Sequence, residues 1–238
     1  MIFSRTHKYD LFKDRTQAGE LLAAKIAEVL REDPDFDPAS AVVIGLPRGG
    51  VPVAKEIAIA LQCPLDVLVS KKLPSPENPE FAVGAVSSDG IVVVDDRSTS
   101  YFHIPKDYIE AQKERLIPLT KALEHQWLTD AGIERRPDVQ GRWVIVVDDG
   151  IATGMTALAA LRSMQMRAVG GLVLAVPVMS YDAYRGLKDE CDHLVALSIR
   201  YDFAAVSQFY EDFHQVEDEE VIACLKEAAS TVSHLIQG

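Results

Sequence analysis

The sequence predicts an α/β fold with a mainly parallel sheet that is flanked by helices. Short, continuous apolar runs, which are typical of strands buried on both faces, alternate with segments that have helical apolar spacing. The 238 residues contain no internal repeat and no low-complexity linker. We therefore expect one domain over residues 1–238, with the alternating core at about 39–199.

The first quarter of the chain predicts a βαβ unit preceded by a helix. Residues 16–32 place their apolar side chains on one helical face, and a following Asp-Pro pair ends the helix. Residues 41–46 and 65–70 have the composition of buried strands, and residues 51–61 between them predict a helix. The connection between the two strands should be right-handed.

The segment over residues 71–90 differs from its surroundings. Prolines at positions 74, 76 and 79 stand among Ser, Asn and Lys residues, so we expect a loop with little regular structure. Residues 81–87 and 91–94 predict a hairpin around the turn Ser88-Asp89-Gly90.

The rest of the chain continues the alternation of helices and strands. We expect helices at 105–128, 154–166, 181–188 and 216–236, and strands at 143–147, 171–176 and 193–198. The two ends, roughly 1–38 and 200–238, fall outside the alternation. We expect these two ends to pack together as a small hood, which is an extra layer over one edge of the sheet.

The composition excludes several classes of function. Lys and Arg number 24 and Asp and Glu 36, which gives a net charge of −12, whereas a partner of duplex nucleic acid needs a basic surface. The longest nearly apolar run, residues 168–179, is too short for a membrane span of about 20 residues, and we expect no export signal. Three cysteines without a CxxC motif fit reduced, buried thiols, so we expect a cytoplasmic protein.

The most informative segment is VIVVDDGIATGMT, residues 144–156. A buried strand carries Asp148 and Asp149 to its carboxyl end, the edge at which open α/β sheets bind ligands. The backbone N–H groups that follow are the unpaired donors of a helix start, and they form a cradle for a phosphate group. Gly154 allows close backbone approach, and two threonine hydroxyl groups add donors.

An anion cradle attracts a phosphate group, but two carboxylates beside it repel that group. A ligand avoids this conflict if it also offers hydroxyl groups, which donate to the carboxylates. A ribose 5′-phosphate does so, because its 2′ and 3′ hydroxyl groups donate to carboxylates while its phosphate lies on the helix. In the alternative interpretation, Asp148 and Asp149 only favour the positive end of the helix dipole. Two consecutive acids at the end of a buried strand are costly for that purpose alone, which favours the ligand.

This segment resembles the signature with which type I phosphoribosyltransferases bind 5-phosphoribosyl-1-diphosphate (PRPP). Neither the GxGxxG fingerprint nor the Walker loop is present. The segments GLPRGG (45–50), PRGGVPVA, NPEFAVGA and FYEDF are also similar to this family, and together they resemble a branch of predicted members whose acceptor is unknown. The resemblance covers nearly the whole chain and implies the type I fold.

The resemblance also implies roles for three groups of residues. The 5-phosphate of PRPP would bind Ala152, Thr153, Gly154, Met155 and Thr156. The pyrophosphate would bind Pro47, Arg48, Gly49, Gly50, Lys71 and Lys72. The acceptor would lie near Phe203, Tyr210 and Asp202, although aromatic residues there are at least as typical of a core. The family's hypoxanthine and guanine enzymes have an acid where this chain has Ala152, so their usual route is not expected here.

The reaction implied is displacement of pyrophosphate from ribose C1 by a nitrogen atom of the acceptor. Catalysis would depend on Asp148, Asp149, Lys72 and Arg48, with Mg²⁺ bound mainly through PRPP and also through the two aspartates. Closure of the loop over residues 71–84 would exclude water. The alternatives are a non-catalytic regulator that binds PRPP or a nucleotide, and a hydrolase that uses water as the acceptor. A homodimer, common in this fold, stays open.

Overall fold

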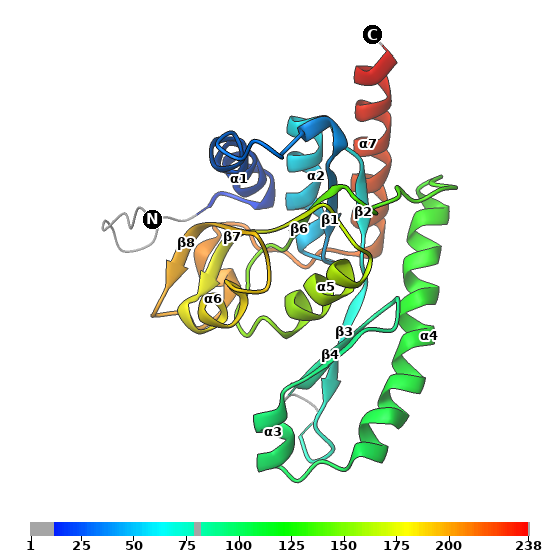
Figure 1. The fold of residues 1–238 in the computed structure, drawn as a ribbon, viewed down its shortest axis with the longest axis vertical. Coiled ribbons are helices and arrows are strands. Elements are labelled where there is room, and N and C mark those ends of the chain that lie inside the picture. The colour runs from blue at the N-terminus through cyan, green and yellow to red at the C-terminus, as the bar shows by residue number, and fades with distance from the viewer. Residues whose placement is uncertain (1–11, 79–81, 238) are drawn as a thin grey trace.

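A five-stranded sheet forms the centre of the protein in the computed structural model, which describes residues 12–78 and 82–237 (Figure 1). Every neighbouring pair of its strands is parallel. The prediction of an α/β fold with a mainly parallel sheet is confirmed. In order across the sheet, the strands are β2 (Leu65–Val67), β1 (Val42–Gly45), β6 (Trp143–Val147), β7 (Gly171–Ser180) and β8 (His193–Arg200).

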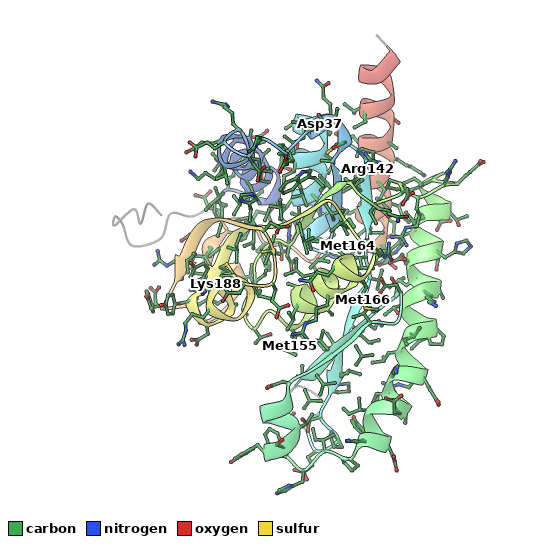
Figure 2. All side chains as sticks on the ribbon, viewed as in Figure 1. Asp37, Arg142, Met155, Met164, Met166 and Lys188 are labelled. Atoms are coloured by element: carbon green, nitrogen blue, oxygen red, sulfur yellow. The ribbon has the colours of Figure 1, made fainter. Side chains whose placement is uncertain are left out.

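Helices cover both faces of this sheet. On one face lie α1 (Arg15–Leu30), α2 (Gly50–Leu61) and α7 (Asp218–Gln237), and on the other lie α5 (Met155–Met166) and α6 (Tyr181–Leu187) (Figure 1). Alternate strand residues divide between the two layers, because Val43 and Ile145 face the first while Ile44 and Val146 face the second. Met164 of α5, labelled in Figure 2, belongs to the second of these cores.

A second, three-stranded antiparallel sheet projects from the main body (Figure 1). It consists of β3 (Ser70–Pro74), β4 (Ala82–Ser87) and β5 (Val92–Val94), and α4 (Lys106–Asp130) packs along it. The predicted hairpin is present, but the prediction of an irregular loop directly after residue 70 is wrong. Lys71 and Lys72 lie in β3, and Leu73 is buried in the small core beneath α4.

Prolines at the end of β3 make this strand hard to recognise in the sequence. Pro74 is the last residue of β3, where the register shifts, and Pro76 follows the strand. An edge strand tolerates proline at such positions, because no ladder hydrogen bond is lost in its interior. The remaining short elements are α3 (Asp96–Tyr101) and the 3₁₀ turns η1 (Pro38–Ser40) and η2 (Val206–Phe209).

The described parts of the end segments 1–38 and 200–238 contact each other. Residues 12–13 run beside residues 209–212, and three backbone hydrogen bonds of 2.8–2.9 Å join the two segments. The rings of Phe12 and Tyr210 pack with centroids 5.3 Å apart. The ends thus contact each other, although α1 and α7 share a layer with α2 and do not form an added layer. Residues 1–11 of the predicted hood lie outside the described residues.

The two longest helices, α4 and α7, have 25 and 20 residues. Both mix apolar with charged side chains, which suits helices that pack on one side and face water on the other. Within the described residues, no helix combines the length and the apolar character that crossing a bilayer requires.

A buried ionic cluster ties α4 to the strands. Arg136 Nε donates to Asp66 Oδ2 at 2.8 Å, and the other guanidinium nitrogen atoms donate to Glu124 and to the backbone of β2. Glu124 Oε2 in turn accepts from Val69 N at 2.9 Å and from Ser88 Oγ at 2.5 Å. The cluster therefore fixes the base of the β3–β4 hairpin, which carries the basic pair of the sequence.

Replacing Arg136 with Ala should lower the free energy of unfolding by about 3–5 kcal/mol, because Asp66 and Glu124 lose their cation while both stay buried. Urea unfolding followed by circular dichroism measures the change. Arg135→Ala is the control, since its side chain is exposed, and a loss below about 0.5 kcal/mol is expected there. Equal losses in the two variants would contradict the role given to the cluster.

Candidate functional site

The loop between β6 and α5 presents free backbone donors. Within the described part of the chain, the N–H groups of Ala152, Thr153 and Gly154 donate no hydrogen bond. Gly154 has a φ of +82° and precedes α5, whose first N–H groups have no intrahelical acceptor. Ser180 Oγ anchors the loop by donating to Ala152 O at 2.6 Å. Residues 152–156 thus offer the donors that the sequence predicts, and their binding of phosphate stays a prediction.

The glycine-rich loop after β1 lies directly against the acidic end of β6. The peptide bond between Pro47 and Arg48 is cis. A Cβ atom on Gly49 would lie 2.0 Å from Asp149 Oδ2, and one on Gly50 would lie 2.6 Å from Val147 O. Only glycine permits this approach, which brings the two predicted ligand-binding loops side by side.

Asp149 is held at both its backbone and its side chain. Arg15 Nε donates to Asp149 Oδ2 at 2.8 Å, and only 7% and 11% of the two side chains are exposed. Tyr210 Oη donates to Asp149 O at 2.7 Å, and Asp149 N donates to Asp148 Oδ1 at 2.9 Å. The sequence does not reveal Arg15 as part of the site, because 134 positions separate it from Asp149. The only signal is a cation in the first turn of a helix, where the helix dipole disfavours it.

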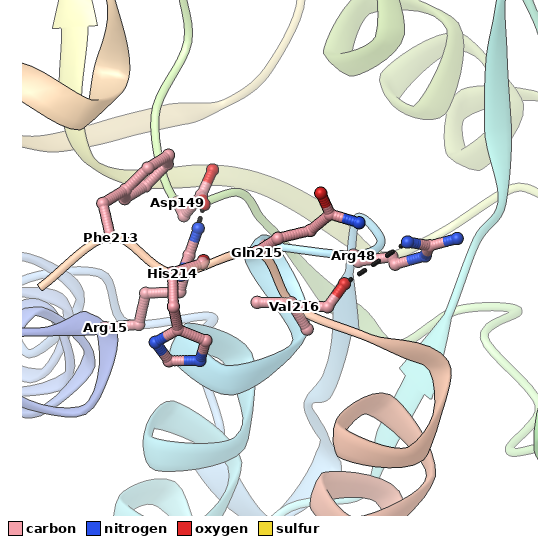
Figure 3. Close-up of a pocket in the computed structure, with 8 residues that line it drawn as sticks. Arg15, Arg48, Asp149, Phe213, His214, Gln215 and Val216 are labelled. Atoms are coloured by element: carbon pink, nitrogen blue, oxygen red, sulfur yellow. Dashed lines mark hydrogen bonds and ion pairs between the residues drawn. The ribbon is translucent and has the colours of Figure 1, made fainter.

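A pocket of about 470 Å³ opens beside Asp149 (Figure 3). The Arg15 guanidinium lies over the Phe213 ring, 4.0 Å from its centroid, and Nη1 donates to His214 O at 2.9 Å. Residues 213–216 and Arg48 complete most of the lining. The pocket therefore connects the acidic end of β6 with the glycine-rich loop.

Arg48 is tied to the start of α7. Its Nε lies 3.0 Å from Asp218 Oδ1, and its Nη1 lies 3.6 Å from Glu217 Oε2 and 3.4 Å from Val216 O. Because 40% of the Arg48 side chain is exposed, these contacts are partly solvated and of modest strength. A pyrophosphate group would have to compete with these acids for the guanidinium.

Burial raises the pKa of both acids that follow β6. For Asp148 the rise is large, and the negative charge of Asp149 adds to it. For Asp149 the Arg15 guanidinium opposes the effect of burial on the pKa. Within the described residues, Asp148 has no ion-pair partner. A ligand that supplies hydroxyl donors or a cation would therefore stabilise the charged form of Asp148.

The basic pair on β3 is exposed. Neither Lys71 nor Lys72 forms an ion pair with any residue of the described ranges. Neighbouring strand residues point to opposite faces of a sheet, so only one of the two can face the glycine-rich loop. Binding of pyrophosphate by this pair stays a prediction.

The three residues predicted near the acceptor have different surroundings, although Phe203 and Tyr210 share one aromatic cluster. Asp202 pairs with Arg200 through contacts of 3.1 and 3.2 Å, and Phe203 is half-buried in an aromatic cluster. Tyr210 is 5% exposed and donates its hydroxyl group to Asp149. In this structure Tyr210 therefore holds Asp149 in place, and its ring presents no free face to a ligand. An acceptor role for Asp202 and Phe203 stays a prediction.

The acidic pair offers carboxylate oxygen atoms, which are ligands that Mg²⁺ prefers. Within the described residues, no group of three or more His, Cys, Asp or Glu side chains is placed to hold a metal ion. Asp148 and Asp149 therefore fit an ion that takes most of its ligands from substrate phosphate groups and water, and they do not fit a resident metal. Magnesium binding of this kind stays a prediction.

The sequence is similar to a known domain family and to two proteins with provisional names. The profile of the phosphoribosyl transferase domain matches residues 13–214. Two Mycobacterium tuberculosis proteins, from strains CDC 1551 / Oshkosh and ATCC 25618 / H37Rv, are each 40% identical over 219 residues and are named provisionally as phosphoribosyl transferases. The match covers 92% of this chain and 47% of each relative, so the chain spans about half the length of these relatives.

A solved structure shares the fold and much of the sequence. The crystal structure of TT1426 from Thermus thermophilus is 38% identical, with a TM-score of 0.75, and the match covers 91% of this chain and 98% of that one. The profile, the relatives and the shared fold confirm the resemblance that the segments at 45–50 and 144–156 carry. The chain belongs to the phosphoribosyl transferase domain family.

Proposed function

We propose that this protein transfers the 5-phosphoribosyl group of PRPP to a nitrogen atom of a small acceptor and releases pyrophosphate. The observation that carries the proposal is the meeting of three features at one edge of the sheet. The free N–H groups of residues 152–156, the acids Asp148 and Asp149, and the glycine-rich loop 47–50 adjoin one another. A phosphate, a pair of sugar hydroxyl groups and a pyrophosphate need these three kinds of partner.

Different residues of the chain bind different parts of the substrate. The N–H groups of residues 152–156 bind the 5-phosphate and anchor the ribose. Asp148 and Asp149 accept hydrogen bonds from the ribose hydroxyl groups and stabilise the positive charge that develops on the ring as the bond from C1 to pyrophosphate breaks. Arg48 and Lys72 neutralise the leaving group. When bound, Mg²⁺ supplies further charge neutralisation on the pyrophosphate.

A regulator that binds PRPP or a nucleotide without turnover is the second candidate. One observation favours it, because Arg48 is paired with Glu217 and Asp218, and Asp149 is paired with Arg15. Two of the four groups proposed for catalysis therefore form internal ion pairs. A regulator needs only the binding loop, whereas transfer requires Arg48 to leave Glu217 and Asp218 and to bind pyrophosphate instead.

Pyrophosphate release distinguishes these candidates. The protein is incubated with PRPP, Mg²⁺ and a panel of nucleobases and other nitrogen acceptors, and pyrophosphate is measured over time. Release that depends on one acceptor supports transfer, and release without any acceptor supports hydrolysis. PRPP binding without release supports a regulator. Absence of both binding and release contradicts the assignment of the site.

Asp148→Asn should lower kcat for PRPP turnover by about a hundredfold and leave stability nearly unchanged. The amide keeps an oxygen atom that accepts from Asp149 N, but it lacks the charge that stabilises the ribose cation. No ion pair is broken here, unlike in Asp149→Asn, which leaves Arg15 buried without its anion. Initial rates and thermal unfolding measure the two effects. A folded variant with the kcat of the unmodified protein would refute this role.

Lys72→Ala should weaken pyrophosphate binding by about tenfold, or about 1.4 kcal/mol, and leave ribose 5-phosphate binding nearly unchanged. The side chain is exposed on β3 and is proposed to contact only the leaving group. Isothermal titration calorimetry with each ligand measures both dissociation constants. Lys226→Ala is the control, because Lys226 is exposed on α7. Equal weakening for the two ligands counts against the role of Lys72.

A further inference from the structure

Arg15 lies outside the short motifs at residues 45–50 and 144–156, yet it pairs directly with the central acid of the site. We propose that Arg15 is a positioning residue, which holds the Asp149 carboxylate in one orientation toward the ribose hydroxyl groups. This inference rests on the proposed phosphoribosyl transfer and assigns a part in it to the N-terminal segment of the chain.

The Arg15 guanidinium is fixed by three different contacts. Nε donates to Asp149 Oδ2 at 2.8 Å, Nη1 donates to His214 O at 2.9 Å, and the face of the group lies over the Phe213 ring. Only 7% of the side chain is exposed. A planar group held along two donor directions and one face cannot swing away as a solvated surface arginine does. The ion pair is therefore part of the built site (Figure 3).

Asp149 is fixed in a way that leaves one oxygen atom for a ligand. Its N–H group donates to Asp148 Oδ1, and its carbonyl oxygen accepts from Tyr210 Oη. Arg15 engages Oδ2 only, on the side where Gly49 leaves room for the carboxylate. Within the described residues, no N–H group donates to Oδ1, and the Asp148 carboxyl group lies within hydrogen-bonding reach of the Asp149 carboxylate, so a sugar hydroxyl group would bind where the two acids meet. An acid held at its backbone and at one carboxylate oxygen atom presents the other in a single direction.

The Arg15 guanidinium also stabilises this arrangement electrostatically. The groups that face the Asp149 carboxylate are Asp148 on the same loop, Arg15 from α1, the Tyr210 phenol and the uncharged backbone of Gly49. Without the guanidinium, two adjacent acids would lack the buried cation that pairs with one of them, and their repulsion would turn the Asp149 carboxylate from its present direction.

The contrary possibility is a lock, in which Arg15 withholds Asp149 from the substrate until the ion pair breaks. The two roles predict opposite results when the guanidinium is removed. A lock predicts tighter PRPP binding and faster turnover, because the acid is released. A positioning residue predicts slower turnover, because the acid loses its direction.

The test compares Arg15→Gln, Arg15→Lys and the control Arg31→Gln, whose side chain is exposed just beyond the end of α1. In steady-state assays with PRPP, Mg²⁺ and the acceptor that the pyrophosphate-release assay identifies, Arg15→Gln should lower kcat/KM by about a hundredfold. The decrease should lie mainly in kcat, because the oriented carboxylate acts on the charge that develops in the transition state. Arg15→Lys keeps a cation beside Asp149 but cannot donate in two fixed directions, so its kcat/KM should fall less. Arg31→Gln should match the unmodified protein.

Three results would overturn the proposal. The first is an Arg15→Gln protein with an unchanged kcat/KM, and the second is a more active one, which would establish the lock. The third is an Arg15→Lys protein with no rescue relative to Arg15→Gln. Should Arg15→Gln fail to fold in thermal unfolding, Arg15→Lys alone decides, and a kcat/KM equal to that of the unmodified protein refutes the positioning role. Failure of the proposed function differs from all of these, because the unmodified protein itself would then not turn over PRPP.

Discussion

The parallel pairing of β1 with β6 is the constraint on which the site depends. Their register sets Gly45 beside Val147, so the loops that follow the two strands start at the same level of the sheet edge. Gly49 then lets the first loop approach Asp149 more closely than any side chain would allow. One edge of the sheet therefore combines backbone donors with an acidic pair, and no further element is needed to bring them together.

Burial of two adjacent acids at this edge costs free energy that the ends of the chain offset. Arg15, from the start of α1, supplies a buried cation, and Tyr210 supplies a hydroxyl donor. The segments at residues 12–13 and 209–212 are joined by backbone hydrogen bonds and by the packing of Phe12 on Tyr210. The two ends thus hold each other in place and deliver both groups to the same acid. This explains why segments outside the alternating pattern return to the sheet edge.

The sequence predicts the elements whose signal is local and misses those that depend on distant partners. Strand β6 has the predicted bounds, because its apolar run stops at two acids. Strand β3 is hidden by the proline at its end, and its identity depends on pairing with β4, which the pattern of residues 70–74 does not reveal. The sequence offers only a cation in the first turn of a helix as a signal of the contact between Arg15 and Asp149, because the contact forms only when the whole sheet is assembled. The buried place of Tyr210 is hidden for the same reason.

Helix α5 links the two parts of the proposed site. It begins at the free N–H groups after Gly154, and farther along Ala159 packs against Ala85 and Val93 of the second sheet. In addition, Ser163 and Arg167 bond to Asp89 in the turn of the β4–β5 hairpin. A helix of 12 residues is a stiff rod, so the second sheet is positioned directly relative to the loop that would bind the 5-phosphate. Lys72 is carried by this sheet, and its distance from that loop is therefore set by packing on α5.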